Sequence, residues 1–419
     1  MKKIAALFCA FCLLFSLAAA GFAVSPLGDT DGDGAVTPAD ARAVLRVSVR
    51  LDEPGEYADA MDVDADGHVT AADARLVLRR AVGIIMRFPP EMPIPVPREE
   101  NAFSLTVEAP RALLYEAEDN TILFQKEIDE RTAPASTIKL LTALTALKYC
   151  DPEKEFTVGD EIYLIGWDSS VCGLEEGMIF TLRQLLYGML LPSGNDAAFC
   201  IAANVGRTLF DCDDTEDAVR RFVSLMNHTA WEIGMDHTNV VSPDGYDAPG
   251  QHTTARDLLT LARTALDNEL ILQICATRAV TFDLLYEETD EPEEKGPTTA
   301  EEGPAVSEEE TTPEEGAQNG ESGEEPGEKK EEKPTDITWY STNRFLNQGD
   351  RFYDRRVFGL KGGFTDDAGC CLIAAYRHED KTYIAIVMGA NSFDGRYECA
   401  SAMMNAAAAG PEPTVPPVG

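Results

Sequence analysis

"APASTIKLLTAL", residues 133–144, places a serine three positions before a lysine at the start of an apolar run. On one helix, positions i and i+3 face the same way, so Ser136 and Lys139 are expected about one turn apart. A serine hydroxyl is a poor nucleophile without a neighbouring base, and a lysine whose pKa is lowered can be that base. The competing interpretation is that Ser136 only caps the helix and Lys139 is a stray charge.

Two later stretches can complete such a site. "PSGND" places Ser193 and Asn195 on a tight turn between two helices, and "GLKGGFTDDAG" places Lys361 before two glycines that let a substrate backbone approach a strand edge. Each stretch is weak alone, since Ser193 could be a helix cap and Lys361 a solvated charge. The order Ser-x-x-Lys, Ser-x-Asn, Lys-x-Gly is specific. With five histidines and no G-x-S-x-G segment, a Ser–His–Asp site has little support.

The surrounding sequence mixes strands and helices, which predicts an α/β or α+β domain. Short alternating segments indicate a hairpin, and a stretch that is apolar nearly all round indicates a helix buried inside the domain. A pair of apolar runs joined by a polar turn indicates two further strands. The expected elements are a hairpin at 112–125, helices at 137–149, 182–191, 196–206 and 395–408, and strands within 370–390.

Residues 103–406 resemble the serine-type D-alanyl-D-alanine carboxypeptidases, which are low-molecular-mass penicillin-binding proteins related to peptidase family S11. "APASTIK", "YGMLLPSGNDAA", "SPDGYDAPGQHTTARDL", "TNRFL" and "LKGGFTDDAG" follow the blocks of that family in order. The resemblance implies a β-lactamase/DD-peptidase-like fold, in which an antiparallel sheet is flanked by helices and the cleft lies at the sheet edge.

The resemblance also implies a role for each motif residue. Ser136 becomes the acylated nucleophile and Lys139 its base. Ser193 relays a proton to the leaving D-alanine, Asn195 holds Lys139 and the substrate amide, and Lys361 supplies a positive field. The backbone N–H groups of Ser136 and Phe364 form the oxyanion hole. The implied substrate-binding residues are Gly362, Gly363, Phe364, Thr365, Arg344 and Arg396.

This chain departs from the family at the third motif, where Gly362 replaces a threonine that hydrogen-bonds the free carboxylate of the terminal D-alanine. Thr365 is a poor replacement, because three residues along a strand its side chain lies on the opposite face. A guanidinium fork suits a carboxylate well, so we expect Arg344 first, and Arg396 beside it, to bind that group. The family's C-terminal β-domain and amphipathic anchor are also missing, so we expect no stable membrane anchor.

Two acidic segments repeat near the start of the chain, "DTDGDGAVTPADARAVLR" from Asp29 and "DVDADGHVTAADARLVLR" from Asp62. Carboxylates on alternate residues converge only if a hard cation with six to eight oxygen ligands neutralises them. Acidic surface turns are the alternative. The predicted ligands of two calcium ions are Asp29, Asp31, Asp33, Ala35, Thr37 and Asp40 in the first loop, and Asp62, Asp64, Asp66, His68, Thr70 and Asp73 in the second.

These two loop–helix copies resemble a type I dockerin. The resemblance covers residues 27–86 and implies a small all-α calcium-binding domain that docks to a cohesin on a scaffoldin. Dockerins often carry Ser or Thr at loop positions 10 and 11, where this chain has Pro38–Ala39 and Ala71–Ala72.

The remaining segments outline the domain organisation of the 419-residue chain, whose net charge is −38. An apolar stretch after two lysines indicates a cleaved signal peptide. A tract with 19 acidic and 4 basic residues from Glu287 to Lys333 has nothing apolar to bury and is expected to be disordered. Its charge argues against nucleic acid as a partner. The predicted segments are a signal peptide at 1–23, a Pro-rich linker at 87–102, the acidic insertion at 287–335 and a Pro-rich tail at 407–419.

The sequence therefore predicts an exported, cell-wall-associated carboxypeptidase that acts on peptidoglycan stem peptides, binds β-lactams and needs no cofactor for catalysis. The alternative is a scaffold-docked, wall-binding module that binds penicillin but turns over poorly. A β-lactamase fits less well, because no second acidic motif for deacylation is apparent. Eight cysteines outside the predicted signal lie mostly in apolar runs, where they behave as small buried hydrophobes, and their pairing stays open.

Overall fold

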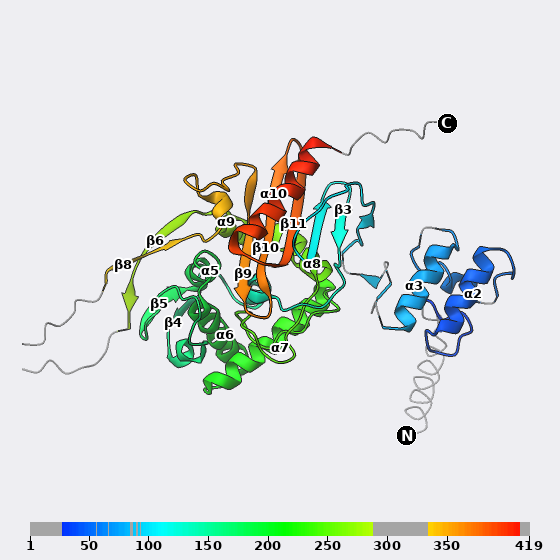
Figure 1. The fold of residues 1–419 in the computed structure, drawn as a ribbon. Coiled ribbons are helices and arrows are strands. Elements are labelled where there is room, and N and C mark those ends of the chain that lie inside the picture. The colour runs from blue at the N-terminus through cyan, green and yellow to red at the C-terminus, as the bar shows by residue number, and fades with distance from the viewer. Residues whose placement is uncertain are drawn as a thin grey trace, which may run out of the picture.

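The computed structural model describes residues 27–287 and 334–410, except residues 56, 66, 84–86, 89–90 and 93. The predicted signal peptide, nearly all of the acidic insertion and most of the tail lie outside the described residues. Figure 1 shows the described part as a small helical module and a larger α+β domain. None of the described helices combines the length and the apolarity that crossing a bilayer requires.

The larger domain is built on a six-stranded sheet with the order β1-β3-β2-β11-β10-β9. All neighbouring strands are antiparallel except β1, which pairs with β3 in parallel over two residues. The predicted antiparallel sheet is therefore confirmed. Its strands are β1 (Arg98–Glu99), β2 (Arg111–Glu116), β3 (Thr121–Lys126), β9 (Val357–Thr365), β10 (Gly369–His378) and β11 (Lys381–Ala390).

Helices cover both faces of this sheet, so its central strands are apolar on both sides. In β2, Leu113 and Tyr115 point into the larger core, whereas Ala112 and Leu114 point into the smaller one. On the smaller side α10 (Phe393–Ala409) packs against β10 and β11 (Figure 1). The larger core holds α4 (Lys139–Tyr149), α5 (Leu182–Leu190), α6 (Asn195–Phe210), α7 (Thr215–Ile233), α8 (Ala255–Leu266) and α9 (Glu269–Ala276).

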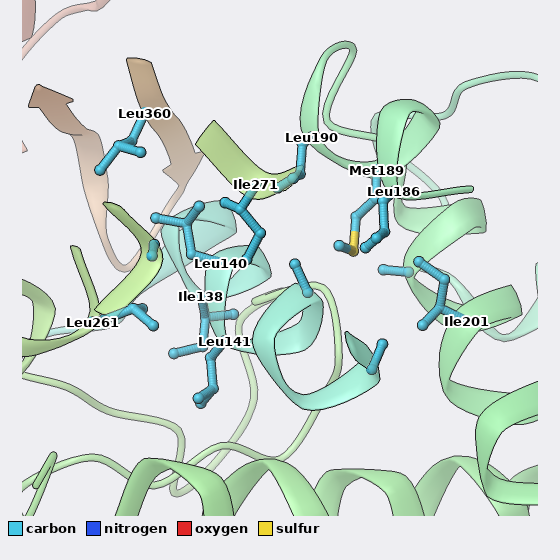
Figure 2. Close-up of a cluster of buried hydrophobic side chains, with 14 of the residues drawn as sticks. Ile138, Leu140, Leu141, Leu186, Met189, Leu190, Ile201, Leu261, Ile271 and Leu360 are labelled. Atoms are coloured by element: carbon cyan, nitrogen blue, oxygen red, sulfur yellow. The ribbon is translucent and has the colours of Figure 1, made fainter. Parts of the chain in front are cut away.

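The short 3-10 helix Ala135–Ile138 leads directly into α4, and the two are anchored in the larger core. Figure 2 shows Ile138, Leu140 and Leu141 among side chains of α5, α6, α8 and α9. Ser136 and Lys139 are interspersed with these apolar residues in the sequence, since Ile138 lies between them and Leu140 and Leu141 follow Lys139. Burial of the anchors therefore fixes the position and direction of the Ser-x-x-Lys segment.

Two small sheets lie beside the main one. One has the order β4-β5-β7, and in the other β6 pairs with β8 across the acidic insertion. The backbone N–H of Leu284 donates to the carbonyl of Thr335 at 2.9 Å, which closes the second ribbon. The strands are β4 (Glu155–Thr157), β5 (Met178–Thr181), β6 (Ala279–Asp283), β7 (Leu285–Tyr286) and β8 (Asp336–Tyr340).

The helical module consists of α2 (Pro38–Ser48), α3 (Ala71–Ala81) and a 3-10 turn at Ala58–Ala60. Its core is small and contains Val44 and Val77, which occupy equivalent positions in the two sequence repeats. Each helix starts with a capping box, formed by Thr37 and Asp40 in α2 and by Thr70 and Asp73 in α3. The twelfth residue of each loop thus also anchors the helix that follows.

Candidate active site

The Ser136–Lys139 pair lies at the start of α4. Lys139 Nζ donates a hydrogen bond to Ser136 Oγ at 2.9 Å. Lys139 is fully buried, whereas Ser136 is half-buried and lines a cleft of about 460 Å³. The structure therefore presents the hydroxyl to a ligand and keeps the amine behind it.

The turn between α5 and α6 brings Ser193 and Asn195 to the same amine. Lys139 Nζ donates to the carbonyl oxygen of Ser193 at 3.0 Å, and it also donates to Asn195 Oδ1. Ser193 has a φ of +68°, a left-handed conformation that is uncommon for residues other than glycine. This conformation lets both the carbonyl and the hydroxyl of Ser193 point into the site.

Lys361 reaches the site from β9, at the edge of the main sheet. Its Nζ donates to Ser193 Oγ at 2.9 Å and to the carbonyl oxygen of Gly362 at 2.8 Å. Ser193 Oγ also lies 3.5 Å from Lys139 Nζ. One hydroxyl thus connects two buried amines, and all five residues predicted as catalytic are close together.

Both lysines have lowered pKa values. Burial lowers the pKa of Lys139 to about 8, although the carboxylates of Asp244 and Asp196 act in the opposite direction. Burial also holds the pKa of Lys361 well below its usual range, and the positive charges of Lys139 and Arg396 add to that effect. The amine that bonds the nucleophile is therefore suited to accept a proton near neutral pH.

The nucleophile is held by close backbone contacts on two sides. A Cβ added to Gly363 of β9 would lie 2.8 Å from Ser136 N, so a side chain there would collide with the nucleophile's backbone. Ala135, immediately before the serine, has a φ of +46°, and a Cβ on Gly245 would lie 2.0 Å from its carbonyl oxygen. The strained turn at Ala135 therefore depends on glycine packed against it.

The predicted substrate-binding residues lie mostly along the same cleft. Gly362, Gly363, Phe364, Thr365 and Arg396 line it together with Ser136. Arg396 is buried, its Nη1 donates to the carbonyl of Gly363 at 2.8 Å, and its Nε has no hydrogen-bond partner among the described residues. A Cβ on Gly362 would lie 3.4 Å from Arg396 Nη1. The position that lacks the family's threonine is therefore next to a guanidinium.

The structure does not bring Arg344 to the cleft, contrary to the expectation that it binds the substrate carboxylate first. Arg344 Nε donates to Asp350 at 2.7 Å, and its Nη1 bonds Asp394. Its guanidinium also lies 4.6 Å from the centre of the Phe352 ring. The guanidinium of Arg344 is thus already paired with two carboxylates, and Arg344 is absent from the residues that line the cleft.

Three supporting residues were not anticipated from the sequence. Ser169 Oγ accepts a hydrogen bond from Asn195 Nδ2 at 2.8 Å and so orients the amide that holds Lys139. The buried carboxylate of Asp196 accepts N–H groups of Cys172, Gly173 and Leu174, which fixes the loop beside the cleft. The position of Asp196 directly after Asn195 was an available signal.

Asp244 is the third supporting residue. It is buried, and its Oδ1 accepts bonds from the hydroxyl of Ser242 and the N–H of Tyr246. Its Oδ2 has no hydrogen-bond partner among the described residues. This carboxylate is the largest of the charges that raise the pKa of Lys139 against the effect of burial.

The two predicted calcium loops gather carboxylates as expected. Oxygen atoms of Asp29, Asp31 and Asp40 lie within 4.8 Å of one another, and those of Asp62, Asp64 and Asp73 do the same. Donor sets made only of oxygen suit a hard divalent cation, so these residues fit calcium. The remaining predicted ligands belong to the same two loops, but Asp66 lies outside the described residues.

The eight cysteines outside the predicted signal are free thiols in the structure, and most are buried. Burial raises the pKa of Cys275 and of Cys371 to about 12, which leaves both thiols protonated and unreactive at neutral pH.

Comparison with known proteins gives matches for both parts of the chain. Residues 98–291 match the family model of the D-alanyl-D-alanine carboxypeptidases of peptidase family S11, and residues 27–80 match the model of the dockerin type I domain. The D-alanyl-D-alanine carboxypeptidase DacF of Bacillus subtilis (strain 168) is 26% identical over 292 residues, which are 69% of this chain and 59% of that protein. The D-alanyl-D-alanine carboxypeptidase of Streptomyces sp. (strain K15) is 26% identical over 289 residues, which are 68% of this chain and 82% of that protein.

Solved structures show the same fold. The crystal structure of the Streptomyces K15 DD-transpeptidase superposes with a TM-score of 0.57 at 24% identity and covers 72% of this chain and 98% of that chain. Penicillin-binding protein D2 from Listeria monocytogenes, in its ampicillin-bound form, gives a TM-score of 0.50 at 22% identity with the same coverage. Residues 98–291 of this chain are thus similar to the S11 D-alanyl-D-alanine carboxypeptidase family, and residues 27–80, ahead of them, are similar to type I dockerin domains.

Proposed function

We propose that this chain is an exported hydrolase that removes the terminal D-alanine from peptidoglycan stem peptides through an acyl-enzyme on Ser136. The observation that carries the proposal is the 2.9 Å hydrogen bond from Lys139 Nζ to Ser136 Oγ, inside a cleft that also holds the Ser193–Lys361 pair. The proposal also rests on the named relatives, which are D-alanyl-D-alanine carboxypeptidases.

In the first step neutral Lys139 accepts the proton of Ser136 as Oγ attacks the carbonyl carbon of the penultimate D-alanine. With a pKa of about 8, roughly one Lys139 in ten is neutral at pH 7. An ordinary lysine with a pKa of 10.5 would be neutral about 300 times less often. Burial of the amine therefore supplies most of the available base.

The tetrahedral intermediate carries a negative charge on the former carbonyl oxygen. Backbone N–H groups of Ser136 and Phe364 bind this oxyanion in the proposed mechanism, since both residues line the same cleft. The positive field of Lys361 favours the same charge. The approach of Gly363 to within van der Waals distance of the nucleophile's backbone keeps these donors close to each other.

Ser193 protonates the leaving amine. Its hydroxyl bonds Lys361 Nζ and lies within reach of Lys139 Nζ, so the proton it gives up can be replaced by either amine. D-alanine then leaves, and a water molecule activated by Lys139 hydrolyses the ester on Ser136. Asn195 keeps Lys139 oriented through both steps.

Arg396 binds the free carboxylate of the terminal D-alanine in this proposal. It is a buried cation next to Gly362, and a buried charge without a full set of partners gains strongly from an anion. The absence of a hydroxyl at position 362 favours a second candidate function, a scaffold-docked, wall-binding module that binds penicillin but turns over poorly.

A paired measurement separates the two candidates. The full chain is labelled with a fluorescent penicillin, and D-alanine release is assayed from a muropeptide that ends in D-Ala-D-Ala. We expect both labelling and release, and we expect Ser136→Ala to abolish both. Labelling without release would support the second candidate, and release that survives Ser136→Ala would contradict an acyl-enzyme on this serine.

For the dockerin module we propose one calcium ion in each loop, a cohesin on a scaffold protein as the partner, and a location at the cell wall outside the membrane. The convergent carboxylates of the two loops support the first part, and the family match supports the second. Calcium-dependent binding of the full chain to a cohesin-bearing scaffold protein, measured by calorimetry, tests the partner. Equal binding in EGTA would contradict it.

A further inference from the structure

The three tryptophans of this chain lie in very different surroundings. Trp339 is buried against Phe180 and Phe282. Trp231 is 58% exposed, and the guanidinium of Arg87 lies 4.4 Å from its ring centre. Trp167 is 93% exposed, although an indole is among the most costly side chains to leave in water. Trp167 is the most exposed of the large apolar side chains that the structure describes, so its ring is available to a ligand that an indole suits.

The backbone on both sides of Trp167 is held by Tyr246. Gly166 packs against the ring of Tyr246, since a Cβ there would lie 2.5 Å from Cζ. The hydroxyl of Tyr246 donates to Asp168 Oδ1 at 2.8 Å, and the N–H of Ser169 donates to the carbonyl of Gly166 at 3.1 Å. The turn is therefore fixed, and the indole is presented to solvent on a defined support.

Trp167 directly precedes a segment that lines the catalytic cleft. The three residues that follow it, Asp168, Ser169 and Ser170, line the cleft together with Ser136. A substrate that extends out of the cleft past Asp168 would therefore meet this turn. Val171 and Tyr163, four residues away along the chain on either side, are also exposed.

The charges around the turn indicate which kind of substrate it suits. Asp168, Asp247 and Asp366 line the cleft, so an anionic lipid surface or polyanion would be repelled. Carboxylate oxygens accept hydrogen bonds from hydroxyl groups, and the flat apolar face of an indole packs against the C–H face of a sugar ring. Together these features fit a polyhydroxylated, ring-shaped ligand.

We propose that Trp167 is a stacking platform for a sugar ring of the glycan strand that carries the stem peptide. This inference rests on the proposed function, because it assumes that the peptide in the cleft is attached to a glycan. Trp167 then favours sugar-linked stem peptides over free peptides without taking part in the chemistry at Ser136.

The first test compares two substrates in the full chain, a free pentapeptide that ends in D-Ala-D-Ala and the same pentapeptide attached to its disaccharide. For Trp167→Ala we expect a roughly 3- to 10-fold lower kcat/KM on the sugar-linked substrate, mostly through KM, and little change on the free peptide. Tyr340→Ala is the matched control, since Tyr340 is 67% exposed and lies outside the cleft. Equal losses on both substrates, or no loss on either, would overturn the inference.

A second measurement separates this inference from the proposed function. Oligomers of N-acetylglucosamine without peptide are titrated into the Ser136→Ala chain while tryptophan fluorescence is recorded. We expect a saturable change that disappears when Trp167→Ala is added and persists with Tyr340→Ala. No change would overturn the sugar platform even if D-alanine release were intact. A saturable change in a chain whose wild type releases no D-alanine would support the platform and count against the proposed function alone.

Discussion

In the catalytic cleft three cationic side chains, Lys139, Lys361 and Arg396, are buried close together, whereas in the helical module two sets of three carboxylates converge. Burial lowers the pKa values of both lysines, and the charges of Lys139 and Arg396 lower that of Lys361 further, so the cleft reduces its own charge by releasing protons. An ionised carboxylate has no proton to release, so it cannot reduce its charge in this way.

The loops of the module show the opposite response. The N–H of Asp33 lowers the pKa of Asp31, but desolvation and the charges of Asp33, Asp40 and Asp29 outweigh it and raise that pKa. This mutual repulsion would be relieved by a cation bound between the carboxylates, as in the proposed calcium sites. Repulsion within a cluster of like charges can thus be reduced in two ways, by a change in the protonation of the cluster or by binding of an ion of opposite charge. The cleft relies on the lowered pKa values of its lysines, and in our proposal the module relies on bound calcium.

The largest effect is expected from Lys139→Arg, which keeps the charge but cannot lose the proton. Because general-base catalysis is worth about 100- to 10,000-fold, the rate of labelling by fluorescent penicillin should fall by that factor. Lys148→Arg, on the exposed end of the same helix, is the matched control and should label at the wild-type rate. Labelling of Lys139→Arg at the wild-type rate would show that acylation does not require a neutral amine at position 139.

Arg396→Ala should lower kcat/KM for a free D-Ala-D-Ala terminus by roughly 10- to 150-fold, the value of a hydrogen bond to a charged group. An amidated terminus should lose much less, and the ratio of the two rates within one variant is independent of partial unfolding. Gly362→Thr should raise the free-acid rate. Arg344→Ala is the control, because its fork is already bonded to Asp350 and Asp394. Loss of selectivity in Arg344→Ala alone would reverse the assignment.

Removal of calcium should destabilise the helical module and leave the cleft active. An ion present at 100 times its dissociation constant stabilises the folded state by about 2.7 kcal/mol. Calorimetry of the full chain should therefore show one transition that moves to lower temperature in EGTA, while D-alanine release at 25 °C is unchanged. Asp31→Asn should reproduce part of the shift. A melting profile identical with and without EGTA would contradict the calcium assignment.

A smaller effect is expected from Asp244→Asn. Its carboxylate raises the pKa of Lys139, so its removal should lower that pKa and move the rising limb of the acylation rate, centred near pH 8, towards lower pH. The change at pH 7 should stay below about 10-fold, the effect of one pKa unit. Asp283→Asn, at the exposed end of β6, is the control. A limb that moves to higher pH would show that Asp244 does not act through the charge of Lys139.

The same lysine affects stability in a predictable direction. Its pKa is lower in the folded chain than the ordinary value of 10.5, so between about pH 8 and 10.5 the unfolded chain binds more protons. The unfavourable contribution of Lys139 to the free energy of unfolding is therefore complete below pH 8 and is relieved as pH rises through that window.

Local sequence was enough to predict the residues that act together at short range. Ser136 and Lys139 are one turn apart, and Ser193 and Asn195 share one tight turn, so their meeting depends little on the rest of the fold. The hairpin of β2 and β3 was equally predictable from alternation. In each case the relevant distance is set by a few consecutive residues.

The choice between Arg344 and Arg396 could not be made in this way. Both arginines belong to segments that resemble the family in sequence, but Asp350 and Asp394 bond Arg344, and Asp394 lies 50 positions away along the chain. The support that Asp196 gives to the loop at 172–174 and the pairing of β6 with β8 are also long-range. Such contacts depend on the packing of the whole domain, so they cannot be predicted from a short motif.

The acidic insertion between β6 and β8 separates the residues of the candidate active site into two stretches of chain. Ser136, Lys139, Ser193 and Asn195 precede the acidic insertion, whereas Lys361 and Arg396 follow it, and the family match itself ends at residue 291. The two stretches meet again through β6–β8 and through β2–β11 in the main sheet. A single cut between residues 288 and 333 would therefore yield two fragments that each hold part of the site and share a long hydrogen-bonded seam. Such a cut would remove none of the candidate active-site residues, so the two fragments are suited to a fragment-complementation experiment.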